Sequence, residues 1–251
     1  MDVTNFIAIS KSSKEALKSA NLLKSVQINC LIEGDIGTGK TTLAKYIVPN
    51  APIINGNNFD EILNLSTLSN VAIITDFENI TNLQKLYEII SKNRIRIIAT
   101  TKKKINDDLF DQFFGVKIFL PSLKERIEDL KPLARYFFNE AKKTLGIDID
   151  EHSIDYSKLD LSQNCISLKR SIYFYILSKN LKDNEIISIL EIFLEKNIGT
   201  TDDYRKFLYL YEAPLIKVAL NKYKSQLQVA EQLGLNRNTL RKKINDLKDF
   251  L

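Results

Sequence analysis

Short runs of β-branched residues alternate with helical patterns through the first 120 positions of the chain. Apolar residues recur at helical spacing near 40–48, 80–92 and 123–145. The runs that are typical of buried strands are 26–33, 51–55, 71–76, 94–101 and 116–120. Strands that alternate with helices predict an α/β core built on a parallel sheet of about five strands.

Beyond Gly146 the pattern becomes wholly helical, with apolar spacing over 166–181 and 183–195. We expect these helices to form a small subdomain that packs on the core. The polar stretch 196–206 is typical of a linker. The predicted organisation is an α/β domain at 1–146, a helical subdomain at 147–198, a linker at 199–211 and an all-helical domain at 212–251.

Residues 222–247 predict a helix, a turn and a second helix. The two apolar faces comprise Leu227, Val229, Ala230 and Leu233, then Leu235, Leu240, Ile244 and Leu247. Gly234 suits the positive φ of a tight turn, and Ala230 is small where two helices cross closely. Asn236 or Asn238 can cap the second helix. The pattern is that of a helix-turn-helix.

The positive charge of this tail indicates the kind of partner that it binds. Residues 215–251 hold eight basic and three acidic side chains, so they account for the whole net charge of +5. A basic helix of this kind would meet the phosphates and base edges of double-stranded DNA. The alternative is a solvated basic helix packed on the core. The predicted DNA-binding residues are Asn236, Arg237, Asn238, Thr239, Arg241, Lys242 and Lys243.

Residues 34–41, GDIGTGKT, fit a phosphate-binding loop that follows a strand and opens a helix. Its backbone amides would cradle phosphates, Lys40 would reach the terminal phosphates, and Thr41 with Asp76 would hold Mg²⁺. The alternative is a glycine-rich turn that binds nothing. We therefore predict a site for ATP or ADP with Mg²⁺, made by Gly34, Gly37, Thr38, Gly39, Lys40, Thr41, Thr42 and Asp76.

A nucleotide-hydrolysing site usually has a second carboxylate beside the first. Asp76 ends an apolar strand, but the adjacent residue is Phe77. Glu78 keeps the side of Asp76, one step farther along, if the strand continues. The second carboxylate is otherwise missing.

The chain has no run of about 18 apolar residues, and its first residues lack the order of a signal peptide. We expect a cytoplasmic protein with no membrane partner. Cys30 and Cys165 each sit in an apolar pattern, which favours small buried side chains over a disulfide.

Two specific motifs are LPSLKERIEDL at 120–130 and LNRNTLRKK at 235–243. With the loop at 34–40, the segment SKSSKE at 10–15 and the strand at 94–101, they resemble the NtrC-type bacterial enhancer-binding proteins, which activate sigma-54 RNA polymerase. The resemblance covers nearly the whole chain. It implies a P-loop AAA+ core, a small helical lid at 147–198 and a Fis-type helix-turn-helix at 212–251.

The departures from that family concern its sigma-54 contact loop and the positions that serve ATP hydrolysis. The interval between Lys40 and Asp76 contains no GAFTGA loop, so we do not expect contact with sigma-54, while other contact with RNA polymerase stays open. Alignment with the family puts Asn106 and Gln112 at the two arginine-finger positions. It also puts Lys102 at the sensor I asparagine and Ile166 at the sensor II arginine.

An arginine finger contributes about 10³ to 10⁵ in rate in other nucleotide hydrolases. We therefore assign no catalytic residue, and we expect nucleotide binding with very slow hydrolysis in a DNA-binding transcriptional regulator. A second hypothesis is an ATP-driven remodelling enzyme that uses Lys102, Lys103 or Glu78. A third is a plain DNA-binding or chromosome-organising protein whose core is only a scaffold.

Fis-type tails in the resembling family pair as dimers. The helix 212–223 could supply an apolar dimer face through Leu215, Ile216, Ala219 and Leu220. Packing of these residues within one tail is the alternative. A small module has little core of its own, so we expect a homodimer through the C-terminal domain.

Overall fold

The computed structural model describes residues 6–147, 154–179 and 181–251. The chain divides into two compact units, Met1–Asn180 and Leu181–Leu251. Each unit is described by itself. The division falls inside the predicted 147–198 subdomain, and the predicted domain boundaries remain predictions.

The first unit contains a five-stranded, fully parallel sheet in the order β2-β3-β4-β1-β5. The strands are β1 Cys30–Glu33, β2 Ile53–Asn55, β3 Val71–Thr75, β4 Arg96–Thr101 and β5 Val116–Phe119. All five predicted strands are present, each shorter than predicted. The prediction that a strand begins at Val26 was wrong, because β4 and β5 pair with β1 only from Cys30 onward.

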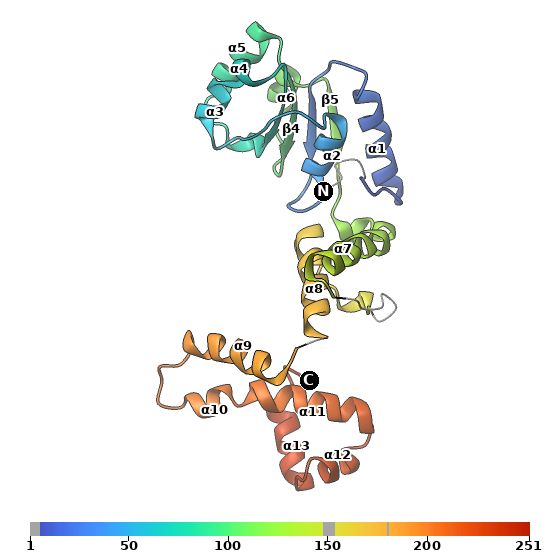
Figure 1. The fold of residues 1–251 in the computed structure, drawn as a ribbon, viewed down its shortest axis with the longest axis vertical. Coiled ribbons are helices and arrows are strands. Elements are labelled where there is room, and N and C mark those ends of the chain that lie inside the picture. Colours follow the sequence, from blue (N-terminus) through green and yellow to red (C-terminus); the bar gives the residue numbers. More distant parts are fainter. Residues whose placement is uncertain (1–5, 148–153, 180) are drawn as a thin grey trace. The chain divides into compact units, whose positions relative to one another are not determined.

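Helices cover both faces of this sheet (Figure 1). One face is covered by α1 Lys11–Leu23 and α2 Lys40–Ile47, which bury apolar residues such as Leu23 and Leu43. The other is covered by α3 Phe59–Leu63, α4 Leu65–Leu68, α5 Leu83–Asn93 and α6 Asp107–Phe113. Burial on both faces explains why the strands read as continuous apolar runs.

A separate apolar cluster lies between two further helices of this unit, α7 Leu130–Leu145 and α8 Cys165–Ser178. The predicted helix at 123–145 begins later than expected. Its first residues form the short 3-10 helices Leu123–Glu125 and Ile127–Asp129. Ser122 and Glu125 form a capping box at the start of the first of these 3-10 helices. The predicted parallel core is confirmed, and α7 and α8 form a helical cluster in the same unit.

The second unit is all-helical, as predicted. It comprises α9 Asp183–Glu195, α10 Asp203–Phe207, α11 Tyr209–Tyr223, α12 Gln226–Gln232 and α13 Arg237–Asp246. Ile216, Val229 and Leu240 lie in the core where α11, α12 and α13 meet. Helix α9 has no buried residue, although it is rich in isoleucine.

Across the three described ranges, no helix combines the length and the apolar character that crossing a membrane requires.

Candidate functional site

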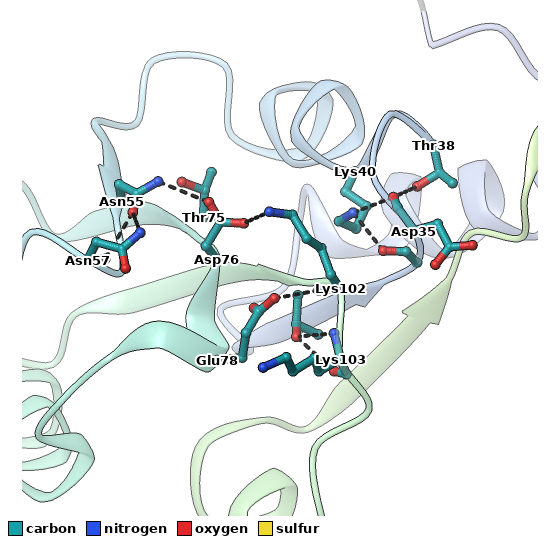
Figure 2. A network of polar contacts seen from close by, with 12 residues as sticks. Asp35, Thr38, Lys40, Asn55, Asn57, Thr75, Asp76, Glu78, Lys102 and Lys103 are labelled. Atoms are coloured by element: carbon teal, nitrogen blue, oxygen red, sulfur yellow. Dashed lines mark hydrogen bonds and ion pairs between the residues drawn. The ribbon is translucent and has the colours of Figure 1, made fainter. Parts of the chain in front are cut away.

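The glycine-rich loop joins β1 to α2, and Lys40 is the first residue of that helix. Lys40 is only 8% exposed. Its Nζ donates to the carbonyl oxygens of Gly34 and Asp35, each at 2.7 Å (Figure 2). Burial lowers the pKa of Lys40, and the nearby charge of Lys102 lowers it further. The lysine therefore holds its own loop in shape, and phosphates would have to replace two carbonyl contacts.

The start of helix α8 lies against the loop. The backbone N–H of Cys165 donates to the carbonyl of Gly37 at 3.0 Å, and the Asn164 side chain donates to the carbonyl of Ile36 at 2.8 Å. Gly37 has a φ of +74°, and a Cβ there would lie 2.2 Å from the carbonyl oxygen of Gln163. Only glycine fits without strain, because both its conformation and its contact exclude a side chain.

A pocket of about 540 Å³ opens at this loop. It brings together six of the eight predicted nucleotide-binding residues, namely Gly37, Gly39, Lys40, Thr41, Thr42 and Asp76. Gly34 and Thr38 belong to the loop but do not line the pocket. The remaining lining residues are Ile36, Thr75, Thr100, Lys102, Cys165, Ile166 and Lys169.

Lys169 was missed by the sequence analysis. It follows Ile166 by three positions on α8, so both side chains face the pocket. Ile166 carries no charge, but Lys169 places an ammonium on the same helix face, where it pairs with Glu140 at 3.0 Å. The helical spacing from Ile166 was the signal that could have found it.

The opposite wall of the pocket is made by Asp76 and Lys102. The Nζ of Lys102 lies 2.8 Å from Oδ1 of Asp76, and the Asn55 side chain donates to Oδ2 at 3.0 Å (Figure 2). The hydrogen bond from Lys102 lowers the pKa of Asp76, and the same contact raises the pKa of Lys102. Both oxygens of this carboxylate are therefore engaged by the chain itself.

The position after Asp76 is apolar in structure as well as in sequence. Phe77 is 1% exposed and packs into the core. The strand ends at Thr75, and a 3-10 helix, Phe77–Asn79, follows. The side chain of Glu78 consequently reaches the end of β4, where its Oε1 accepts the backbone N–H of Lys102 at 3.0 Å. Continuation of the strand through Glu78, which the sequence analysis left open, does not occur.

The LPSLKERIEDL motif has a buried structural role. Arg126 is 1% exposed and donates from its guanidinium to the carbonyl of Thr38 at 2.5 Å and to Ser13 Oγ at 3.1 Å. Asp129 accepts the backbone N–H groups of Ile9 and Ser10 at 2.7 and 2.8 Å. The motif thus ties the phosphate loop to the start of α1.

The two positions that resemble arginine fingers lie on α6. Asn106 caps this helix by accepting the backbone N–H of Leu109 at 2.9 Å. Gln112 is exposed on the same helix. Neither side chain carries a charge, and both belong to the first unit.

The predicted helix-turn-helix is formed by α12, the turn at Gly234 and α13. Gly234 has a φ of +63°, and the backbone N–H of Leu235 donates to the carbonyl of Ala230 at 2.8 Å. Asn236 is the N-cap of α13, and its side chain accepts the N–H of Asn238 at 2.9 Å. Leu227, predicted to be in the apolar face, is exposed instead.

Six of the seven predicted DNA-binding residues are exposed on or beside α13: Asn236, Arg237, Asn238, Thr239, Arg241 and Lys242. Lys243 is half-buried and donates to Glu212 of α11. It therefore fastens the two helices together. The exposed set combines two guanidinium groups with an ammonium and neutral donors, which suits phosphates and base edges.

The predicted dimer face on α11 divides in two. Ile216 and Ala219 are buried within the unit, whereas Leu215 is exposed. The larger exposed apolar surface lies on α9. It comprises Ile186, Ile187, Ile189, Leu190, Ile192 and Phe193.

Comparisons with known proteins agree with these features. A family model described as "Bacterial regulatory protein, Fis family" matches residues 208–247. The DNA-binding transcriptional regulator NtrC of Rhizobium meliloti (strain 1021) is 26% identical over 205 residues, which cover 62% of this chain and 42% of NtrC. This chain thus aligns with less than half of that protein's length.

Another relative matches nearly end to end. The HTH-type transcriptional regulatory protein TyrR of Haemophilus influenzae is 21% identical over an alignment of 299 positions, gaps included. The alignment covers 95% of this chain and 93% of TyrR. Among solved structures, NtrX from Brucella abortus in complex with ADP aligns with a TM-score of 0.59 at 15% identity, covering 97% of this chain and 69% of that one. That likeness shows the fold.

Proposed function

We propose that this chain, which is related to the NtrC-type regulators and ends in a Fis-family domain, is a DNA-binding transcriptional regulator whose AAA+ domain holds ATP or ADP as a bound ligand. The observation that carries this proposal is helix α13. This helix presents Arg237, Arg241 and Lys242 to solvent, and Leu240 and the following Leu247 pack it into the core of the unit. A rigid helix with exposed donors is what the major groove accepts.

The DNA-binding part is tested by Arg241→Ala in the full chain. Loss of one phosphate contact should reduce the slope of log affinity against log salt by about 1. The measurement is a fluorescence-anisotropy titration of a duplex at several salt concentrations. Lys196→Ala removes the same charge from an exposed site outside α13 and should leave the slope unchanged. Equal effects of both variants would reject α13 as the DNA-binding helix.

The nucleotide part of the proposal is supported by the loop. Lys40, Thr41 and Thr42 line one pocket with the loop glycines, at the start of α2. Such a helix start offers unpaired N–H groups and a favourable dipole to phosphates. The groups that speed hydrolysis elsewhere are replaced by Phe77, Asn106 and Gln112. We propose that bound nucleotide is turned over very slowly.

We also propose that the regulator acts without a sigma-54 contact loop. The chain between β2 and β3 forms only the short helices α3 and α4. Residues of α3 and α4, including Ile62 and Leu65, are buried in the core. This segment serves packing, and any contact with RNA polymerase would use another surface.

The finer expectation for the site is Mg²⁺ held through the nucleotide by Thr41 and Asp76. Both residues line the pocket. Lys102 competes with Mg²⁺ for Asp76, because its ammonium already lies 2.8 Å from one carboxylate oxygen.

We propose a homodimer through the second unit, with α9 as its principal face. The exposed apolar residues Ile186, Ile189, Leu190 and Phe193 recur at helical spacing and form one face of α9, and the helix buries no residue within its own chain. A second copy of the helix would pack against this apolar face, with Glu191 and Glu195 on the polar side of each helix. Helix-turn-helix dimers bind two half-sites about one helical turn apart, which gives such pairing a use.

Ile189→Asp places a charge in the middle of that face. We expect the variant to sediment as a monomer at concentrations where the wild type is a dimer. Glu191→Ala, an exposed polar change on the same helix, should remain dimeric. A wild-type monomer at high concentration, or a dimer that survives Ile189→Asp, would contradict this assignment.

A further inference from the structure

Lys102 occupies an unusual position in the pocket. Three lysines line it, Lys40, Lys102 and Lys169, against the single carboxylate of Asp76. The ammonium of Lys102 lies on that carboxylate (Figure 2). A cation of the chain thus stands where a P-loop protein usually places a divalent metal ion.

The sheet order explains this placement. Strand β4 lies between β1, which leads into the phosphate loop, and β3, which leads into Asp76. All three strands are parallel, so their carboxyl ends meet at one edge. The residue that follows β4 is Lys102. Its side chain therefore starts between the loop and the aspartate.

The backbone around Lys102 is fixed on both sides. Its N–H donates to Glu78 at 3.0 Å. The next residue, Lys103, donates its N–H to Thr101 Oγ1 at 3.1 Å, and that hydroxyl donates to the Lys103 carbonyl at 2.8 Å. The lysine side chain is 44% exposed, so it can swing between Asp76 and a phosphate without moving the backbone.

The donor set does not suit Mg²⁺. This ion requires near-octahedral oxygen coordination and usually takes one or two carboxylates in addition to phosphates. Both oxygens of Asp76 are engaged, by Lys102 and Asn55. Phe77 is buried in the core, and one oxygen of Glu78 accepts a backbone N–H.

We propose that the ammonium of Lys102 takes the place of the metal ion, so that this pocket binds a nucleoside di- or triphosphate without a divalent cation. The inference rests on the proposed nucleotide binding and specifies its chemistry. Lys40 supplies one positive charge from the loop, and Lys102 supplies a second from the opposite wall. An ammonium donates to phosphate oxygens as a point charge and needs no octahedral ligand set. Asp76 positions it.

The test is a calorimetric titration of ADP into the full-length protein, in EDTA and again in excess Mg²⁺. We expect the two wild-type affinities to agree within about twofold. For Lys102→Ala, loss of a charge-assisted contact should weaken binding in EDTA by about tenfold. Mg²⁺ should then restore part of the affinity, because Asp76 is released. Lys102→Arg keeps the charge and should bind ADP in EDTA.

The matched control is Lys104→Ala, which removes a nearby exposed lysine that does not line the pocket. It should bind ADP as the wild type does. Circular dichroism at the titration temperature shows whether each variant is folded. Asp76→Asn provides a second probe: it should keep binding ADP in EDTA, since Lys102 is freed rather than lost.

Wild-type binding that requires Mg²⁺ would overturn the inference and leave the proposed nucleotide function standing. Unchanged binding by Lys102→Ala in EDTA would also overturn it, as would an equal loss in Lys104→Ala. Absence of ADP and ATP binding in both buffers would overturn the inference together with the proposed nucleotide function.

Discussion

The nucleotide pocket and helix α13 differ in how their charged groups are occupied. In the pocket, Lys40 donates to its own loop and Asp76 is paired with Lys102. On α13, Arg237 and Arg241 face solvent. A nucleotide must therefore displace existing contacts, whereas DNA would meet groups that already point outward. Substitutions in the pocket should alter structure and binding together, while those on the outer face of α13 should alter binding alone.

The largest expected effect is the unfolding of the second unit, which should remove DNA binding while the nucleotide pocket stays intact. Leu240 is 1% exposed in the core that holds α13. Leu240→Asp buries a charge and should cost about 4 kcal/mol or more, enough to unfold a small domain. We expect DNA binding to be lost and ADP binding to remain, because the pocket lies wholly in the first unit.

Circular dichroism melts, an ADP titration and a DNA titration on the same preparation check this prediction. Leu227→Asp is the matched control, since Leu227 lies exposed on α12. Loss of ADP binding in Leu240→Asp would show that the two units do not fold independently.

A smaller effect is expected from the buried link behind the phosphate loop. Arg126→Met keeps most of the volume but removes the donors to Thr38 and Ser13. Asp129 retains its contacts with Ser10 but loses its buried ion pair with Arg126, 3.5 Å away. We expect a loss of about 3 kcal/mol in the stability of the first unit, with weaker ADP binding and unchanged DNA binding.

Thermal unfolding with and without ADP measures this effect. Lys124→Met changes an exposed side chain in the same segment and should behave as the wild type. A stable Arg126→Met protein with normal ADP affinity would mean that the motif does not support the loop.

The smallest expected effect concerns cysteine alkylation, which ADP and DNA should influence differently. Burial raises the pKa of Cys30 to about 12 and also raises the pKa of Cys165. Only Cys165 lines the pocket. At pH 8 we expect slow alkylation of Cys165, faster as pH rises because the thiolate is the reactive form, and none of Cys30. ADP should slow the reaction by a few fold, whereas DNA should leave it unchanged.

Mass spectrometry of alkylated peptides measures both thiols at once. Protection of Cys165 by DNA alone, or reaction of Cys30 in the folded protein, would contradict this contrast.

The sequence predicted those features that depend on neighbouring residues. Five strands, the phosphate loop and the turn at Gly234 each follow from a short local pattern. The Asp76–Lys102 and Arg126–Thr38 contacts join residues far apart in the chain, so no local pattern reveals them. Only the sheet order and the side-chain directions bring such pairs together.

Helix α9 illustrates a second limit. Its helical spacing predicted an element at 183–195, and the helix spans Asp183–Glu195. Spacing does not say which core a helix joins, and the helix groups with the second unit rather than with α7 and α8. Lys243 likewise looked like its neighbours on α13, but its position against Glu212 depends on how α11 packs.

The central claim is that the pocket binds nucleotide without turning it over. The most direct measurement is ATP binding and steady-state phosphate release by the wild type and Lys40→Ala, with duplex DNA present and absent. We predict that the wild type binds ATP, that Lys40→Ala does not, and that their phosphate release is equally low in all conditions. Phosphate release that is abolished by Lys40→Ala would contradict the account and identify an active remodelling ATPase.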